Sequence, residues 1–208
     1  NSVRATGGLG IYASSTGIFA VNGGRGENLI VETVDVTGKD GGIDVLNNGT
    51  GATSVSSTGF VASSKGNGIA AYNDDSATDI TINANVVDAQ NTGILARNLG
   101  IGNTTITSGS YVEASAGGDG IFGYNGINAG DLTITAVKVQ AGDDGIVAYN
   151  AGRGATSVTA TGDIAGTVSG ISVLNAVNTV TYTSNTTDLT VKAVNVTGGL
   201  YGIIASNQ

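Results

Sequence analysis

The sequence predicts an all-β protein that folds as a single right-handed, single-stranded parallel β-helix, a solenoid. Three observations predict this fold. A hexapeptide of the form Gly-Ile-x-small-x-Asn occurs eight times, short runs with strand-like alternation separate its copies, and the chain has 35 glycines but no proline. The copies begin about 25 residues apart. We therefore expect about eight rungs of three short strands each, in a rod on the order of 40 Å long, since neighbouring strands lie ~4.8 Å apart.

The hexapeptide is predicted to form the first strand of each rung. Its copies are Gly17–Asn22, Gly42–Asn47, Gly68–Asn73, Gly93–Asn98, Gly120–Asn125, Gly145–Asn150, Gly170–Asn175 and Gly202–Asn207. Successive residues of a strand face opposite sides, so the Ile, the small fourth residue and the Asn are expected to face inward. The leading Gly is expected to turn the preceding corner with positive φ.

The recurrent asparagines are expected to form a structural ladder at the corner after this strand. Asn side chains at the same position of stacked strands can hydrogen-bond to the rungs above and below. The predicted ladder is Asn22, Asn47, Asn73, Asn98, Asn125, Asn150, Asn175 and Asn207.

Two further strands are predicted between one hexapeptide and the next. In the third rung they are Asp79–Asn83 and Val86–Ala89, and in the fifth they are Asp131–Thr135 and Val137–Ala141. Thr alternates here with Leu or Ile, which is the two-residue period of a half-buried strand. Three strands this short cannot bury a face alone, so successive rungs must stack.

One rung is longer than the others. The last two hexapeptides begin 32 residues apart, and Leu189 follows its Asn corner seven residues later than the equivalent residue of other rungs. We expect residues 176–187 to contain an inserted loop that leaves the rod, because insertions in solenoids map to loops. A tolerated surface loop is the simpler interpretation, and a functional loop is the alternative.

Composition limits the chemistry of the chain. It has no Cys, His, Met or Trp, which excludes disulfides and the usual zinc, copper, haem and Ser-His-Asp sites. Its net charge of −8 argues against nucleic acid or an anionic membrane as a partner. We expect no cofactor and no metal. Because methionine is absent, we interpret residues 1–208 as a single β-helix fragment of a longer protein.

Acidic residues at predicted corners are the candidates for catalysis or calcium binding. They are Asp74, Asp75, Asp119, Asp143 and Asp144. Paired carboxylates can serve as acid and base or hold Ca²⁺. Asp beside Gly is also an ordinary turn residue, and no basic residue recurs at one position of the rungs. We therefore predict that the chain is not an enzyme, with polysaccharide processing at Asp119 and Asp144 as an alternative.

The outward residues of the hexapeptide strand are the predicted binding surface. Positions three and five are apolar or aromatic in most rungs, and five of the ten aromatic residues lie there. An exposed apolar stripe of several hundred Å² usually has a partner. Contacts between rungs, or a covering segment outside this sequence, are the alternative explanation. The candidate binding residues are Phe19, Leu46, Tyr72, Leu95, Arg97, Phe122, Tyr124, Tyr149 and Tyr182.

The repeats resemble the passenger domains of bacterial autotransporters. The resemblance lies in the Gly-Ile-x-Ala-x-Asn rungs and the intervening strands such as Asp131–Thr135, and it covers Gly17–Asn207. It implies export through a C-terminal outer-membrane β-barrel translocator, to the bacterial cell surface or, after cleavage, to the medium. It implies a binding rod that contacts host cells as an adhesin or virulence factor.

Alternatively, the resemblance implies a released effector that acts as a ligand for a host cell-surface receptor. The partners that it implies are a host cell-surface protein, matrix or glycan, with self-association as a further alternative.

Overall fold

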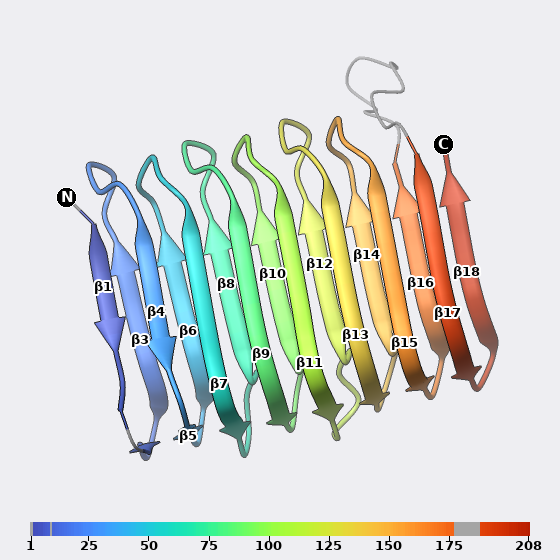
Figure 1. The fold of residues 1–208 in the computed structure, drawn as a ribbon, viewed down its shortest axis with the longest axis horizontal. Helices are drawn as coiled ribbons and strands as arrows, with labels where there is room; N and C mark the ends of the chain where they lie inside the picture. Colours follow the sequence, from blue (N-terminus) through green and yellow to red (C-terminus); the bar gives the residue numbers. More distant parts are fainter. Residues whose placement is uncertain (1, 9, 177–187) are drawn as a thin grey trace.

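The computed structural model describes residues 2–8, 10–176 and 188–208, which form a parallel β-solenoid (Figure 1). The strands belong to two sheets that run the length of the rod, and each strand pairs in parallel with the equivalent strand of the next rung. Within these residues there is no helix, and hence none that could span a membrane. The predicted all-β parallel β-helix is confirmed.

The first sheet, which we call the hexapeptide sheet, consists of the eight hexapeptide strands. Equivalent residues pair from rung to rung, so that Ile94 lies between Ile69 and Ile121, and Asn98 lies between Asn73 and Asn125. The sequence repeat is therefore also the structural repeat of this sheet. Its strands are β3 (Thr16–Asn22), β6 (Gly41–Asn47), β8 (Ile69–Asn73), β10 (Ile94–Asn98), β12 (Ile121–Asn125), β14 (Ile146–Asn150), β16 (Ser169–Asn175) and β18 (Tyr201–Asn207).

The second sheet, which we call the bent sheet, makes up the rest of each rung. Its short strands near the N-terminus are β1 (Val3–Thr6), β2 (Ile11–Tyr12), β4 (Leu29–Thr33) and β5 (Val36–Gly38). Its long strands are β7 (Thr53–Ser63), β9 (Ile80–Ala89), β11 (Thr104–Ala114), β13 (Leu132–Ala141), β15 (Thr156–Gly166) and β17 (Leu189–Gly198).

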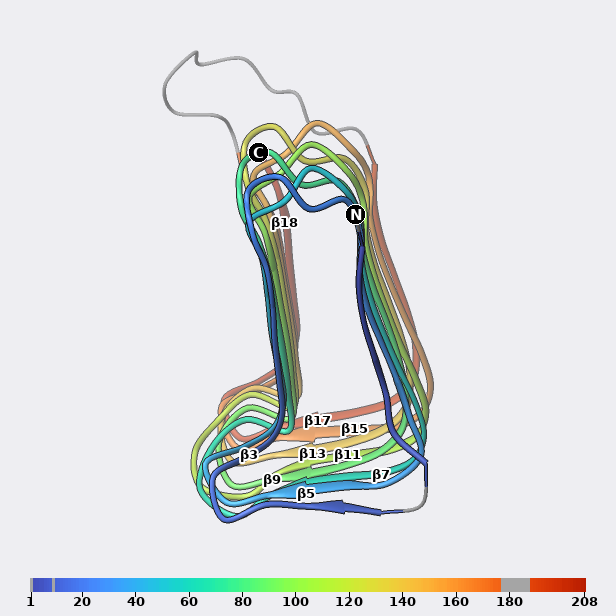
Figure 2. The same ribbon diagram turned by 90° about the vertical axis from the view of Figure 1, so that its left-hand side faces the viewer.

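The predicted second and third strands of a rung are joined into one bent strand over most of the rod. Near the N-terminus the two remain separate, as β1 and β2 and then as β4 and β5, whereas β7 and the later strands run unbroken for 10 or 11 residues. The pairing register shifts inside each long strand, between Ser108 and Tyr111 in β11. Such an irregularity bends a strand, and Figure 2 shows the resulting corner between an upright wall and the base of the rung. From β6 onward, each rung thus has three straight sides but two hydrogen-bonded strands.

The coil is right-handed. Figure 2 looks along the rod from the N-terminal end, and the chain passes down one wall, across the base and up the wall formed by the hexapeptide strands. This path is clockwise and recedes from the viewer, which defines a right-handed coil. The same hand is the rule for connections between parallel strands of one sheet.

The core is a narrow column of aliphatic side chains. Ile69 of the hexapeptide sheet and Ile80, Ile82 and Val87 of the bent sheet are fully buried, and the equivalent residues of other rungs repeat this. Each such side chain contributes about 1.5–3 kcal/mol relative to an exposed one. The fourth hexapeptide position is Ala, Val or Gly because the walls are close together. At Gly123, an added Cβ would lie 3.0 Å from Leu132 Cδ1.

The leading glycines of the hexapeptide do not have positive φ, so that prediction was wrong. Among the described residues, the glycines with positive φ are Gly10 and Gly117. A Cβ on Gly93 would lie 2.4 Å from Val112 Cγ1 and 2.5 Å from the carbonyl oxygen of Gly120. Gly68 and Gly120 meet equivalent atoms at similar distances. Glycine is needed because a valine side chain of the bent strand and a backbone carbonyl of the next rung occupy the space of a Cβ.

The asparagine corners, apart from Asn207 in the last rung, are buried, and they alternate between two hydrogen-bonding patterns. In every second rung the Asn Oδ1 accepts from the backbone N–H two residues later, and Nδ2 donates to the carbonyl four residues later; these are Asn47, Asn98 and Asn150. In the rungs between, Oδ1 accepts from a buried Thr hydroxyl of the preceding rung, as Asn73 does from Thr53 and Asn125 from Thr104. The turns differ accordingly, and the structural period is two rungs.

Among the asparagines of the predicted ladder, direct bonds between side chains occur at two places. Asn22 donates to Asn47 over 2.9 Å, and Asn175 donates to Asn207 over 3.3 Å. In the central rungs the amides bond instead to turn carbonyls and threonine hydroxyls. The expected ladder is therefore a buried column linked mainly through backbone and threonine, since amide pairs alone do not connect it.

Candidate functional site

The outer face of the hexapeptide sheet carries two columns of side chains, which we call the outer stripe. The pairing register sets equivalent residues side by side along the rod. The first column is Phe19, Asp44, Ala70, Leu95, Phe122, Val147, Ser172 and Ile204. The second column is Val21, Leu46, Tyr72, Arg97, Tyr124, Tyr149, Leu174 and Ser206.

Most side chains of the outer stripe are half-buried, because neighbours in the same column cover their flanks. Four members are more exposed: Phe19, Val21 and Ile204, with 66%, 42% and 38% of their surface accessible, and Arg97. Eight of the nine candidate binding residues lie on this stripe. The ninth, Tyr182, and most of the predicted inserted loop at 176–187 lie outside the described residues.

An aromatic and cationic stack occupies the middle of the second column. The rings of Tyr124 and Tyr149 are parallel within 8°, with centroids 5.4 Å apart. The guanidinium carbon of Arg97 lies 5.7 Å from the centroid of the Tyr124 ring. On the opposite side of Arg97, the residue at the equivalent position of the neighbouring strand is Tyr72. Stacked rings and cation–π contacts each contribute about 0.5–1.5 kcal/mol. This stack holds flat, rigid side chains at the surface.

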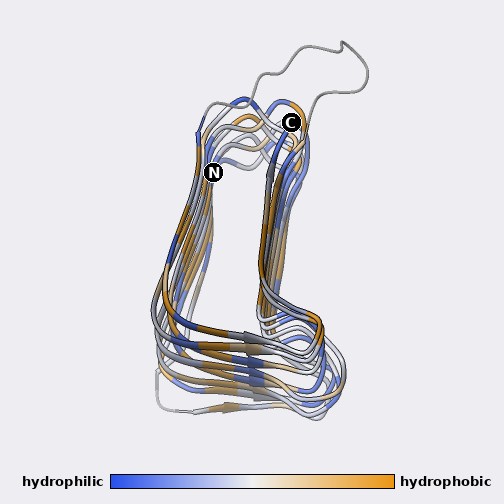
Figure 3. Cartoon of the chain, turned by 90° about the vertical axis from the view of Figure 1, so that its right-hand side faces the viewer, coloured by the Kyte–Doolittle hydropathy of each residue, from blue (hydrophilic) through white to orange (hydrophobic). Residues whose placement is uncertain are grey.

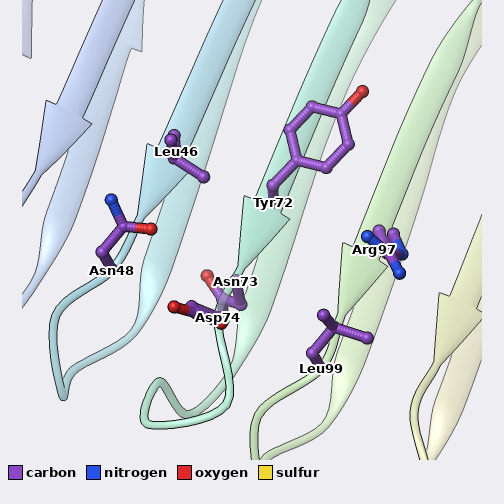
Figure 4. A pocket seen from close by; sticks show the side chains of 7 residues that line it. All are labelled: Leu46, Asn48, Tyr72, Asn73, Asp74, Arg97 and Leu99. Atoms are coloured by element: carbon purple, nitrogen blue, oxygen red, sulfur yellow. The ribbon is translucent and has the colours of Figure 1, made fainter.

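A shallow hollow of about 250 Å³ opens beside the stack (Figure 4). Leu46, Tyr72 and Arg97 come from the adjacent strands β6, β8 and β10, and form one side of it. Residues at the corners after these strands complete it: Asn48, Asn73, Asp74 and Leu99. The hollow thus combines apolar walls with an amide, a carboxylate and a guanidinium.

The polar groups beside this hollow are electrostatically coupled. Burial raises the pKa of the Tyr72 phenol, Asp44 raises it further, and Arg97 opposes the shift. Burial also raises the pKa of Asp44. No carboxylate of the described residues lies within ion-pair distance of Arg97. The ion pair found among the described residues joins Arg4 to Glu32, which lie elsewhere on the rod.

The acidic corner residues accept hydrogen bonds from the backbone. Asp119 Oδ1 accepts from Asp144 N at 3.3 Å, and Asp144 Oδ1 accepts from Ser169 N at 2.7 Å. Burial is the main cause of a raised pKa at Asp119, with Asp143 and Asp144 adding to it. Asp74 accepts from the N–H of Asp75. In the part of the chain that the structure describes, no three acidic side chains gather closely enough to hold a metal ion.

A third polar cluster lies on the bent sheet and was not predicted from the sequence. The Tyr111 hydroxyl donates to Glu113 over 3.0 Å, and the Lys138 ammonium lies 5.3 Å from the Tyr111 ring centroid. Burial, with the hydrogen bond and charge of Glu113, raises the pKa of Tyr111 to about 12. The register shift inside the long strands brings these residues together, and no local sequence pattern marks it.

Comparison with known proteins adds no assignment: no family model, curated protein or solved structure matches this chain.

Proposed function

We propose that this chain is an extracellular binding rod, the β-helical passenger of a bacterial autotransporter. In this proposal the outer stripe contacts host cells, and the protein acts as an adhesin. The observation that carries the proposal is the alignment of aromatic and apolar side chains over successive rungs of one face. The part of the bent sheet that precedes the bend differs from the outer stripe. Its outward positions carry hydroxyl groups, such as those of Thr105, Thr107, Thr133 and Thr135.

The residue types of the outer stripe support a binding role. Tyr and Arg are enriched among residues that dominate interface energies, because they add contact area and directional polar groups. Stacking already restrains Tyr124 and Tyr149, so ordering them on binding costs little side-chain entropy. A host cell-surface protein, a matrix component or a glycan could each use such a surface. Display on the bacterial surface, or release after cleavage, belongs to the same proposal.

A triple substitution tests the outer stripe. In Phe122→Ser/Tyr124→Ser/Tyr149→Ser, bacteria or beads displaying the chain should lose attachment to cultured host cells, because three of the five aromatic side chains of the stripe are removed. Circular dichroism should show that the β-helix is retained, since all three residues face outward. Attachment at the level of the unchanged chain would contradict the proposal.

The matched control removes three exposed apolar side chains that lie off the stripe: Ile101→Ser/Ile127→Ser/Val137→Ser. Their exposed fractions are 63%, 45% and 39%, so this variant tests apolar surface in general. It should attach normally. Purified soluble chain, applied alone, separates the adhesin from a released effector. An adhesin blocks attachment without changing the cells, whereas an effector alters their signalling.

A further inference from the structure

We propose that the hollow beside Tyr72 and Arg97 binds the carboxylated end of an oligosaccharide, such as a terminal uronic acid. This rests on the proposed binding role of the outer stripe, of which Leu46, Tyr72 and Arg97 are members. It adds a ligand class and a defined contact point to that role.

The size of the hollow fits a terminal sugar unit and the unit linked to it. Its volume of about 250 Å³ lies below the ~300–1,000 Å³ typical of sites for drug-sized ligands. It spans three rungs, which corresponds to roughly 10 Å along the rod at ~4.8 Å between strands. A pyranose ring with one linked neighbour is of this size, whereas a folded protein element is larger.

The walls of the hollow suit the two faces of a sugar. Leu46, Leu99 and the ring of Tyr72 give apolar surface, against which the C–H groups of a pyranose can pack. Asn48 and Asp74 supply an amide and a carboxylate at the rim, and these can exchange hydrogen bonds with sugar hydroxyls. Mostly apolar walls with a few polar groups that fix orientation are typical of small-molecule sites.

Charge decides in favour of a sugar that carries a single carboxylate. The Arg97 guanidinium is exposed, is held over Tyr124, and has no carboxylate partner among the described residues. A guanidinium binds a carboxylate through two parallel hydrogen bonds. Asp74 and the net charge of −8 would repel a polyanion or an acidic peptide. A terminal uronic acid offers its carboxylate to Arg97 and hydroxyl donors to Asp74.

The test is titration of the 208-residue chain with three probes, followed by calorimetry and NMR. The probes are a disaccharide that ends in glucuronic acid, its counterpart that ends in glucose, and sodium acetate. We expect the acidic disaccharide to bind with a dissociation constant of about 1 mM, as is usual for a small, shallow site. The glucose-ended disaccharide and acetate should each bind about tenfold more weakly or not at all.

Variants assign this binding to the hollow. Arg97→Gln should weaken the acidic disaccharide about tenfold, and Arg97→Lys should fall between, because it keeps the charge but loses the paired hydrogen bonds. Tyr72→Ala should also weaken binding through loss of the apolar wall. The matched control is Arg153→Gln, which removes the same charge from an exposed corner outside the hollow and should bind normally.

Several outcomes would overturn the inference. Equal binding of the acidic and neutral disaccharides would remove the role of the carboxylate, and equal binding of acetate would leave a simple anion site. Unchanged binding by Arg97→Gln, or no binding of any probe, would exclude the hollow. Failure here is distinguishable from failure of the proposed function. Arg97→Gln leaves Phe122, Tyr124 and Tyr149 in place, and the triple substitution at those positions is scored by cell attachment.

Discussion

At the residue scale, hexapeptide glycines such as Gly93 are required because their positions leave no room for a Cβ. The hexapeptide glycines lie where the end of a bent strand, the start of a hexapeptide strand and the carbonyl of the next rung converge. The sequence correctly predicted that these positions need glycine, but predicted the wrong reason. A need for positive φ and a lack of space for a Cβ both require glycine, so the sequence alone does not distinguish them. Only the distances to Val112 and Gly120 separate the two explanations.

Substitution of one such glycine should be strongly destabilising. Gly93→Ala places a Cβ against Val112 Cγ1 and the Gly120 carbonyl, and relief requires the backbone to move. Overpacking of this kind costs about 1–3 kcal/mol or more in free energy of unfolding, measurable by denaturant titration. Gly109→Ala is the control, since its Cβ would meet nothing closer than 3.6 Å. It should change stability by less than about 0.5 kcal/mol.

The raised pKa of Asp119 makes a prediction about pH. Burial and the neighbouring Asp143 and Asp144 raise this pKa in the folded state above 3.8, so folding favours the protonated form. This group therefore opposes folding at neutral pH, and the opposition disappears as the pH falls below the unfolded-state value. Asp119→Asn keeps an Oδ1 that can accept from Asp144 N, and it should raise the denaturation midpoint at pH 7 but not at pH 3.

The control for this pH effect is Asp75→Asn, at an exposed corner. It should leave the denaturation midpoint nearly unchanged at both pH values. A gain in stability for Asp119→Asn that is equal at pH 7 and pH 3 would show that the carboxylate charge is not its cause.

At the element scale, the two strand types of a rung were not equally predictable. The hexapeptide strands were located from the sequence because Gly, Ile and Asn recur at fixed positions and face the same neighbours in every rung. The union of two predicted strands into a bent one was missed. The residues at the bend, such as Gly109 and Ser110 in one rung and Gly162 in another, look like turn residues. Parallel pairing with the adjacent rungs resumes directly after these residues, so the strand continues past the bend.

The alternation of corners was missed for a similar reason. A repeat of 25 residues accounts for the hexapeptides, whereas the corners repeat every second rung. The signal is present, since Gly-x-Gly-x-Thr occurs at Gly49–Thr53, Gly100–Thr104 and Gly152–Thr156 and not in the rungs between. The Thr of each such corner donates to the Asn of the next rung, as Thr53 does to Asn73. Adjacent rungs are therefore complementary and not identical.

Deletion of whole rungs tests the two-rung period. Removing residues 68–119 joins the second rung to the fifth, so that Thr53 meets Asn125, which normally accepts from a threonine. Removing residues 68–92 joins it to the fourth, whose Asn98 already accepts from Gly100 N. Each unmatched buried polar group costs about 1–3 kcal/mol. In thermal unfolding, the shorter deletion should therefore give the less stable protein, although it retains one more rung. The opposite order would refute the two-rung unit.

At the scale of the whole molecule, the outer stripe was predictable but its hollow was not. The stripe follows from strand alternation and a constant register, both of which are present in the sequence. The hollow needs side chains from three rungs and from corners of two kinds, with Leu46, Tyr72 and Arg97 separated by about 25 residues each. Arg97 looked like an isolated charge in the sequence. In the structure it lies between two tyrosines of neighbouring strands.

The direction of the strands has a mechanical consequence. Each strand lies across the rod, and the hydrogen bonds between rungs run along it (Figures 1 and 3). A load applied between the two ends therefore separates the strand pairs of one rung boundary at a time. A rung contributes ~4.8 Å to the rod while wound, but its chain of about 25 residues extends to roughly 80 Å. Under tension the rod can lengthen in large steps while the remaining rungs keep their shape.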